Sequence, residues 1–161
     1  MPISQTMNSG SQPPSDSGRR TALAVLVQAS GEELAGAWEE LAPKPAFETV
    51  RRAETGLVMV SGRIGGGGAP FNIGEVTVTR CVVRLVSGEV GFGHVLGRDA
   101  VRAELVARFD ALLQSDRYRG AVEEKVLRPV AGRVRREDDL TRRQTAATRV
   151  NFFTMVRGED E

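Results

Sequence analysis

The chain has 161 residues, of which 40% are apolar and 27% are charged, a balance typical of one folded globular domain. Its net charge of +1 and its interleaved acidic residues argue against a nucleic acid or a membrane as partner. The single cysteine excludes an intramolecular disulfide and a thiolate zinc knuckle. No apolar run approaches the roughly 20 residues of a membrane-spanning helix.

The first 18 residues differ in composition from the rest. They contain five serines, three prolines and one charged residue, Asp16. Because this segment has little apolar surface to bury, we expect residues 1–18 to be a disordered tail and residues 19–161 to form a single domain. No signal peptide is predicted after Met1, so we expect a cytoplasmic protein.

Two helices are predicted next. Apolar residues at helical spacing indicate a first helix from about Arg19. Ser30 and Glu33 have the spacing of a capping box, which opens a second helix. Pro43 is expected to stop that helix.

Strand patterns occupy the middle of the chain. Residues 47–52 are a modest strand candidate, and residues 57–64 are a stronger one with apolar residues on both faces, which predicts cover on both sides. Residues 76–86 and 90–96 alternate, and a two-residue turn at 87–88 would make them antiparallel. We therefore expect an antiparallel β-meander of three to four strands.

The second half is predicted to be helical. Asp99 caps a helix whose apolar residues repeat at helical spacing. A further helix begins near Tyr118, and Pro129 should bend or interrupt it. Residues 133–149 are mostly polar, which favours a solvated or partner-facing helix. The expected fold class is α+β, a small antiparallel β-meander flanked by N-terminal and C-terminal helices.

Four consecutive glycines lie between two predicted strands: Gly65, Gly66, Gly67 and Gly68. Glycine permits positive φ and close backbone approach, so this loop is either an anion contact or a connection shaped by a partner surface. No Gly-Lys-Ser/Thr follows, and the next element is a strand, which excludes a Walker A loop. Arg63, Arg80 and Arg98 keep an anion contact open, because arginine binds phosphate well.

The remaining candidates for chemistry are weaker. The glycines at 91, 93 and 97 superficially match a dinucleotide fingerprint, but they lie within a predicted antiparallel strand. A regular two-residue turn would place Cys81 directly opposite His94, the only histidine. Core packing of this pair is favoured over nucleophilic catalysis, because no oxyanion donor or third member accompanies it. No catalytic residue and no metal site is predicted.

An apolar segment stands close to the end of the sequence, at residues 150–156. Such a segment either adds an edge strand to its own sheet or docks on another chain. Its partner-docking candidates are Phe152, Phe153, Met155, Val156 and Arg157.

Over residues 19–160 the chain resembles the PhnG family, subunits of the bacterial carbon–phosphorus lyase system for phosphonate breakdown. Gly67 stands where the family loop usually has a threonine, which weakens a phosphate-binding role for the loop. The stretches that carry the resemblance are Ala53-Glu54-Thr55-Gly56-Leu57-Val58-Met59-Val60, Gly62-Arg63-Ile64-Gly65-Gly66, Ala69-Pro70-Phe71-Asn72, Gly74-Glu75, Thr77-Val78-Thr79-Arg80, Gly97-Arg98-Asp99, Asp110-Ala111-Leu112-Leu113-Gln114 and Phe152-Phe153-Thr154-Met155-Val156-Arg157-Gly158-Glu159-Asp160.

The resemblance implies a transferase-complex subunit that works with PhnH, PhnI, PhnJ and PhnL. That complex transfers a phosphonate to the ribose C1′ of ATP and releases adenine, and PhnJ, an iron–sulfur radical enzyme, later cleaves the product. The nucleosidase chemistry is credited to PhnI, ATP is a co-substrate of the complex, and no cofactor is expected on this chain. Two hypotheses follow: an accessory scaffolding subunit, or a subunit that adds arginine and backbone contacts to a shared ligand site.

Overall fold

The computed structural model describes residues 16–64 and 67–148. Within them the expected α+β class is confirmed, with a meander of three strands. The elements in chain order are α1 (Asp16–Leu26), α2 (Gly31–Glu40), β1 (Phe47–Arg63), β2 (Pro70–Leu85), β3 (Val90–Leu96), α3 (Ala100–Gln114), α4 (Asp116–Val122), the π-helical turn η2 (Glu123–Leu127) and α5 (Arg128–Ala147). Helix α1 therefore begins three residues before Arg19.

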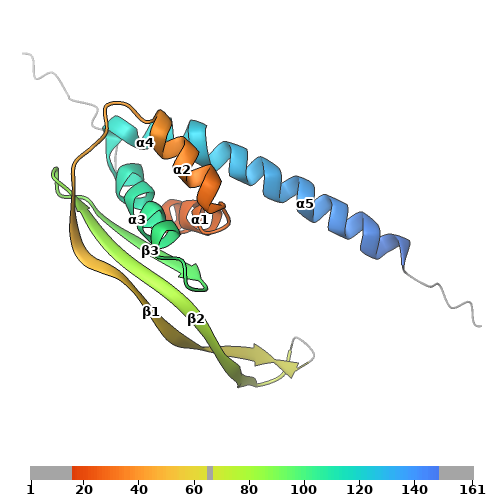
Figure 1. Ribbon diagram of the computed structural model, residues 1–161. Coiled ribbons are helices and arrows are strands. Elements are labelled where there is room, and N and C mark those ends of the chain that lie inside the picture. The colour runs from red at the N-terminus through yellow and green to blue at the C-terminus, as the bar shows by residue number, and fades with distance from the viewer. Residues whose placement is uncertain (1–15, 65–66, 149–161) are drawn as a thin grey trace, which may run out of the picture.

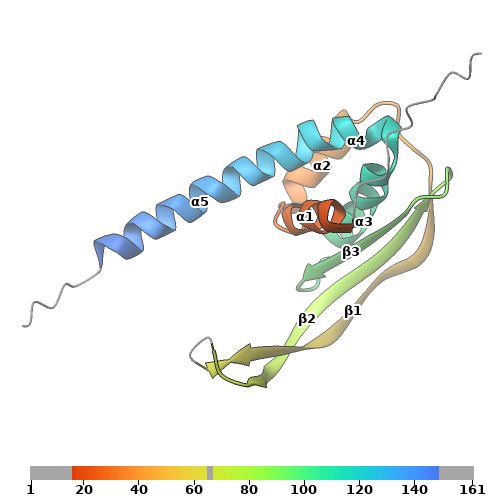
Figure 2. The same cartoon turned by 180° about the vertical axis from the view of Figure 1, so that it is seen from behind.

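The sheet has the order β1-β2-β3, and both pairings are antiparallel. Strand β3 is short, so it covers β2 only between Val78 and Arg84. Figures 1 and 2 show the helices gathered over this part of the sheet, while the rest of the β1–β2 hairpin curves away past them. Helix α3 lies directly against the strands, and α1 and α2 pack on α3.

The two expected strands at 47–52 and 57–64 form the single strand β1. Its pairing with β2 shifts register between Thr49 and Arg51, between Arg51 and Glu54, and between Val60 and Ser61. Such irregularities bend a strand without ending it. Residues 54–56, between the two apolar patterns, pair regularly with β2, so no loop separates the two predicted strands, and the first two distortions lie between Thr49 and Glu54.

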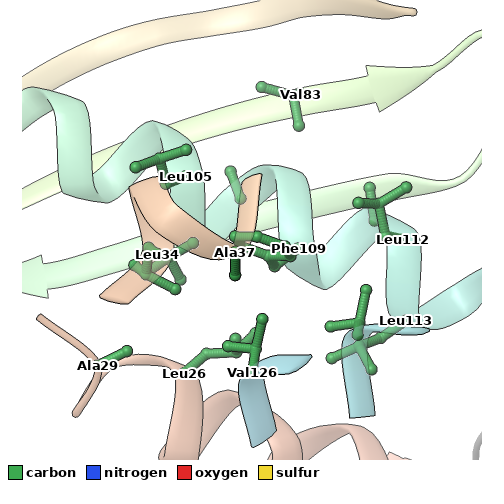
Figure 3. Packing of buried hydrophobic residues seen from close by; sticks show 14 of the residues in the cluster. Leu26, Ala29, Leu34, Ala37, Val83, Leu105, Phe109, Leu112, Leu113 and Val126 are labelled. Atoms are coloured by element: carbon green, nitrogen blue, oxygen red, sulfur yellow. The ribbon is translucent and has the colours of Figure 1, made fainter. Parts of the chain in front are cut away.

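The hydrophobic core surrounds α3, whose side chains are buried along most of its length. Figure 3 shows Phe109 of α3 beside Ala37 of α2, with Leu26 of α1 and Val126 of η2 close by. The residues Leu26, Leu34, Val106, Phe109 and Leu112 are at most 1% exposed. The core thus joins the helical layer to one half of the sheet.

Two glycines of β3 allow α3 to approach the sheet closely. A Cβ atom at Gly91 would lie 1.9 Å from the Ala107 carbonyl oxygen, and one at Gly93 would lie 1.9 Å from the Ala103 carbonyl oxygen. Only glycine leaves room for the helix backbone at these positions. The apparent dinucleotide pattern therefore has a packing explanation.

The turn between β2 and β3 differs from the prediction. The Leu85 N–H donates to the Glu89 carbonyl at 2.8 Å, so the loop has three residues, and Gly88 in it has φ +114°. This moves the register by one residue: Cys81 lies opposite Gly93, and His94 lies opposite Arg80. The predicted pair of Cys81 and His94 was wrong.

The two residues in fact lie on opposite faces of the sheet. Cys81 is buried towards α3, and burial raises the pKa of its thiol. His94 is exposed, so it is not part of the core with Cys81, and a position in an interface stays a prediction. The Cys81 thiol donates to the Arg51 carbonyl at 3.4 Å, and Glu104 raises its pKa further, so its surroundings favour the thiol over the reactive thiolate.

Local signals fixed the ends of the helices. Ser30 and Glu33 form the predicted capping box, with the Glu33 N–H 3.1 Å from Ser30 Oγ and the Ser30 N–H 2.8 Å from Glu33 Oε2. Arg133 also binds Glu33, at 2.8 Å, and together with Ser30 it lowers the pKa of that carboxyl. The predicted cap of α3 is present as well, because Asp99 Oδ1 accepts from the Arg102 N–H at 2.9 Å.

The last helical elements continue one another. Val122, Val126 and Val130 are buried at a spacing of four residues, as the sequence predicted. Proline has no N–H to donate to the preceding turn, and the π-helical turn η2 lies immediately before Pro129. The predicted interruption is therefore a change of helical pitch, after which α5 continues to Ala147.

Replacing Gly93 by alanine tests the close approach of α3. We expect the Gly93→Ala variant to lose about 1–3 kcal/mol of unfolding free energy, because the new methyl group must displace helix backbone. Gly56→Ala is the matched control, since a Cβ there has nothing within 4 Å. Urea unfolding followed by circular dichroism measures both variants, and equal midpoints would contradict the packing role.

Candidate functional site

The hairpin arm is the part of β1 and β2 beyond the last pair of β2 with β3, residues 57–64 and 67–76. Figures 1 and 2 show it extending past the helices. Its large apolar side chains are exposed, with Ile64 at 75% and Ile73 at 64%. The exposed set also includes Leu57, Val58, Met59, Phe71 and Val76.

The hairpin arm is uncovered on both of its faces. Neighbouring residues of a strand point to opposite faces, and Leu57, Val58 and Met59 are each about half exposed or more. The predicted cover on both sides is thus not supplied by the described part of the chain. A two-stranded ribbon with two free apolar faces is only marginally stable in water, and apolar patches of this kind mark interaction surfaces.

The second projection is the helix arm, residues 135–148, which are all exposed. Figure 1 shows α5 running away from the other helices over this length. The arm is polar apart from Leu140, Ala146 and Ala147, which are all exposed. A helix of this length without tertiary packing is marginal in water. It is the solvated or partner-facing helix that the sequence predicted.

The sheet face opposite α3 joins the hairpin arm to the body of the protein. Phe92 and Leu96 of β3 are exposed on this face, at 41% and 70%. Ion pairs of Arg80 with Glu54, at 2.8 Å, and of Arg84 with Glu48, at 3.6 Å, flank them. A mixture of exposed apolar side chains and ion pairs is typical of protein–protein interfaces.

The predicted ligand contacts do not converge on one site. Arg63 pairs with Pro70 near the tip of the hairpin arm, whereas Arg80 lies ten residues further along β2, or ~33 Å away along a strand. The Arg63 guanidinium donates to the Gly68 carbonyl at 3.1 Å, and Arg80 is held by Glu54. Arg98 is exposed just before α3. Arg63 and Arg80 are therefore too far apart to contact one small ligand together.

The glycine loop shows a conformational role where it is described. The Gly68 N–H donates to the Ile64 carbonyl at 3.0 Å, and a Cβ atom at Gly68 would lie 2.8 Å from the same oxygen. Gly67 has open space around it. Gly65 and Gly66 lie outside the described residues, as do the docking candidates Phe152, Phe153, Met155, Val156 and Arg157.

Sequence reasoning missed Asp110, a fully buried carboxylate on α3. It accepts hydrogen bonds from the Arg19 guanidinium, at 2.6 and 3.0 Å, and from the Phe92 N–H at 2.9 Å. Arg19 and Gln114 both donate to the Val90 carbonyl. The only signal was an acidic residue between Phe109 and Ala111 on the apolar face of a predicted helix. This cluster ties α1, α3 and the edge of β3 together.

No group of three or more histidine, cysteine or acidic residues within residues 16–64 and 67–148 could hold a metal ion. No helix within this part of the chain is long and apolar enough to cross a membrane. Two uncovered arms on a small core are typical of a subunit that is completed by other chains.

Comparison with known proteins identifies the family. The family model described as phosphonate metabolism protein PhnG matches residues 17–158. A protein of Rhizobium meliloti (strain 1021), alpha-D-ribose 1-methylphosphonate 5-triphosphate synthase subunit PhnG, is 54% identical over 142 residues, which are 88% of this chain and 90% of that protein. The chain belongs to the PhnG family, which confirms the resemblance seen in the sequence.

Polar substitutions on the hairpin arm test whether it is dispensable for folding. We expect the double variant Leu57→Ser, Met59→Ser to unfold within about 1 kcal/mol of the wild type, because both side chains are already exposed. The isolated variant should also bind less of a dye that reports apolar surface. Leu34→Ala is the buried control and should cost about 2–5 kcal/mol. A comparable loss in the double variant would show that the arm belongs to the core.

Proposed function

We propose that this chain is an accessory, non-catalytic subunit of the complex that makes ribose 1-methylphosphonate 5-triphosphate. In that reaction a phosphonate displaces adenine from the ribose C1′ of ATP. The family and the name of the Rhizobium meliloti relative support the activity. The observation that carries the accessory role is the hairpin arm, whose apolar residues are exposed on both faces.

The chemistry of the reaction favours a scaffolding role for this chain. Phosphonate and triphosphate are anionic, so their site needs several cations that are free to bind them. Three arginines of the sheet are engaged by carboxylates: Arg51 and Arg80 pair with Glu54, and Arg84 pairs with Glu48. These side chains are better placed to stabilise the sheet than to bind a ligand.

The proposed partners are PhnI, PhnH, PhnJ and PhnL of the carbon–phosphorus lyase system. PhnI would carry the nucleosidase step, and ATP would be a co-substrate of the complex, with no cofactor on this chain. We infer a cytoplasmic location, because the reaction consumes ATP. The isolated chain is expected to be inactive.

The alternative function is a contribution of ligand contacts to a shared site. Arg98 favours it, because its side chain is exposed and no described residue hydrogen-bonds it. Arg63 with the amides of the glycine loop, or else Arg80, would then face a ligand held by another subunit.

Deleting residues 150–161 tests the docking role of the C-terminal segment. We expect the truncated chain to lose co-purification with PhnI, because the apolar residues of this segment would be the ones that dock. The readout is the subunit ratio of the complex after co-expression and affinity purification. A truncated chain that still assembles at the wild-type ratio would refute this docking site.

Substituting the arginines separates the two functions. In the assembled complex, Arg63→Ala and Arg80→Ala should leave both assembly and the rate of adenine release at the wild-type level. Arg117→Ala, at an exposed position on α4, is the control for a lost surface charge. A loss of adenine release of about tenfold or more with intact assembly would establish ligand contacts instead.

A further inference from the structure

The sheet has two outer edges in the described residues, and the edge of β3 is largely closed. Leu85 pairs with Glu89, and Gly97 pairs with Thr77, through backbone hydrogen bonds between β2 and β3. Alternation along the strand therefore turns the backbone groups of Val90, Phe92, His94 and Leu96 outwards. Arg19, Asp110 and Gln114 occupy the Val90 carbonyl and the Phe92 N–H. Few backbone N–H and C=O groups of β3 therefore remain free to pair with another strand at this edge.

Among the described residues, the outer edge of β1 has free backbone groups from Glu54 to Val60, where the strand runs into the hairpin arm. Seven consecutive residues, from Glu54 to Val60, pair with β2 without a register shift. Thr55, Leu57 and Met59 lie opposite Thr79, Thr77 and Glu75, whose backbone groups point to the β3 side. The same alternation turns the N–H and C=O groups of Thr55, Leu57 and Met59 towards the open edge. No described residue hydrogen-bonds these backbone groups.

The two halves of the β1 edge differ in their protection. Near the helices the edge carries two register shifts and the charged residues Arg51, Arg52 and Glu54. Bulges and charges are the devices that keep other strands from pairing with an edge. Residues 55–61 read Thr-Gly-Leu-Val-Met-Val-Ser and have no charge and no proline. Only this half of the edge is open to a new strand.

We propose that residues 55–61 of β1 accept an extended segment of a partner subunit as an added fourth strand. This inference rests on the proposed function. Main-chain hydrogen bonds from Thr55, Leu57 and Met59 give the affinity, as in other cases of strand addition. We expect the added segment to be uncharged and to carry apolar side chains on both of its faces, because both faces of the hairpin arm are apolar.

The added strand is assigned to a different subunit because of the two uncovered faces. A second copy of this chain, paired edge to edge, would contribute another ribbon with two free apolar faces. The apolar surface would then grow instead of being buried. A partner subunit that supplies both a strand and a surface would pair with the edge of β1 and bury the apolar faces of the hairpin arm at the same time.

A proline at Met59 tests the ladder directly. The Met59 N–H faces the open edge, so Met59→Pro removes a donor for the added strand without removing a β1–β2 hydrogen bond. Met59→Ala is the matched control, because it shortens the side chain and keeps the N–H. In co-expression with PhnH, PhnI and PhnJ, we expect Met59→Pro to reduce recovery of the complex by about tenfold or more and Met59→Ala to reduce it much less. Equal recovery with both variants would overturn the proposal.

Hydrogen exchange of the wild-type chain gives a readout that does not depend on the variant's folding. The amides of Leu57 and Met59 should exchange fast in the isolated chain and slowly in the complex, while those of Val58 and Val60, which face β2, should exchange more slowly than their neighbours in the isolated chain. Fast exchange in the complex overturns strand addition and leaves the proposed function intact. A wild-type chain that fails to assemble overturns the proposed function itself. Protection that appears in the isolated chain as its concentration rises would identify a second copy and refute the assigned partner.

Discussion

The close contact between α3 and β3 is the constraint on which the rest of the structure depends. The backbone of α3 lies where side chains at Gly91 and Gly93 would have been. That approach brings Asp110 within hydrogen-bond distance of β3, and Asp110 in turn fixes Arg19 of α1. Helices α1 and α2 then pack on the remaining face of α3. A single small-residue contact thus sets the positions of the helical layer and of the short edge strand.

The same arrangement explains why half of the sheet is left uncovered. Helix α3 begins at Ala100, just after β3, and runs along β3 away from the hairpin arm towards Val90, whereas the hairpin formed by β1 and β2 continues in the other direction beyond both α3 and β3. The buried core therefore lies at one end of the β1–β2 hairpin, and the exposed apolar side chains of the hairpin arm lie at the other. In a subunit of a larger assembly this division lets the exposed elements match a partner without disturbing the core.

The sequence predicted the structural features that depend on residues close to one another in the chain. The capping box at Ser30, the Asp99 cap and the three-stranded meander followed from the sequence, because each depends on neighbouring residues. The orientation of Cys81 and His94 did not, since one extra loop residue before Gly88 exchanges the two faces of a strand. Residues 57–60 are apolar on both faces of the strand, but the sequence does not show whether other elements pack on those faces. A buried core strand and an exposed arm therefore could not be distinguished from the sequence. The burial of Asp110 depended on Arg19, which lies 91 residues away.

The uncovered hairpin arm also has a consequence for how such a subunit is maintained in a cell. A copy that has not found its partner presents a long, unprotected strand edge and apolar surface, the features that promote aggregation and that proteases and chaperones act on. Assembly hides these features in the same step that completes the complex. The lifetime of the subunit is then coupled to the supply of its partner, so that surplus copies are removed and the ratio of subunits corrects itself.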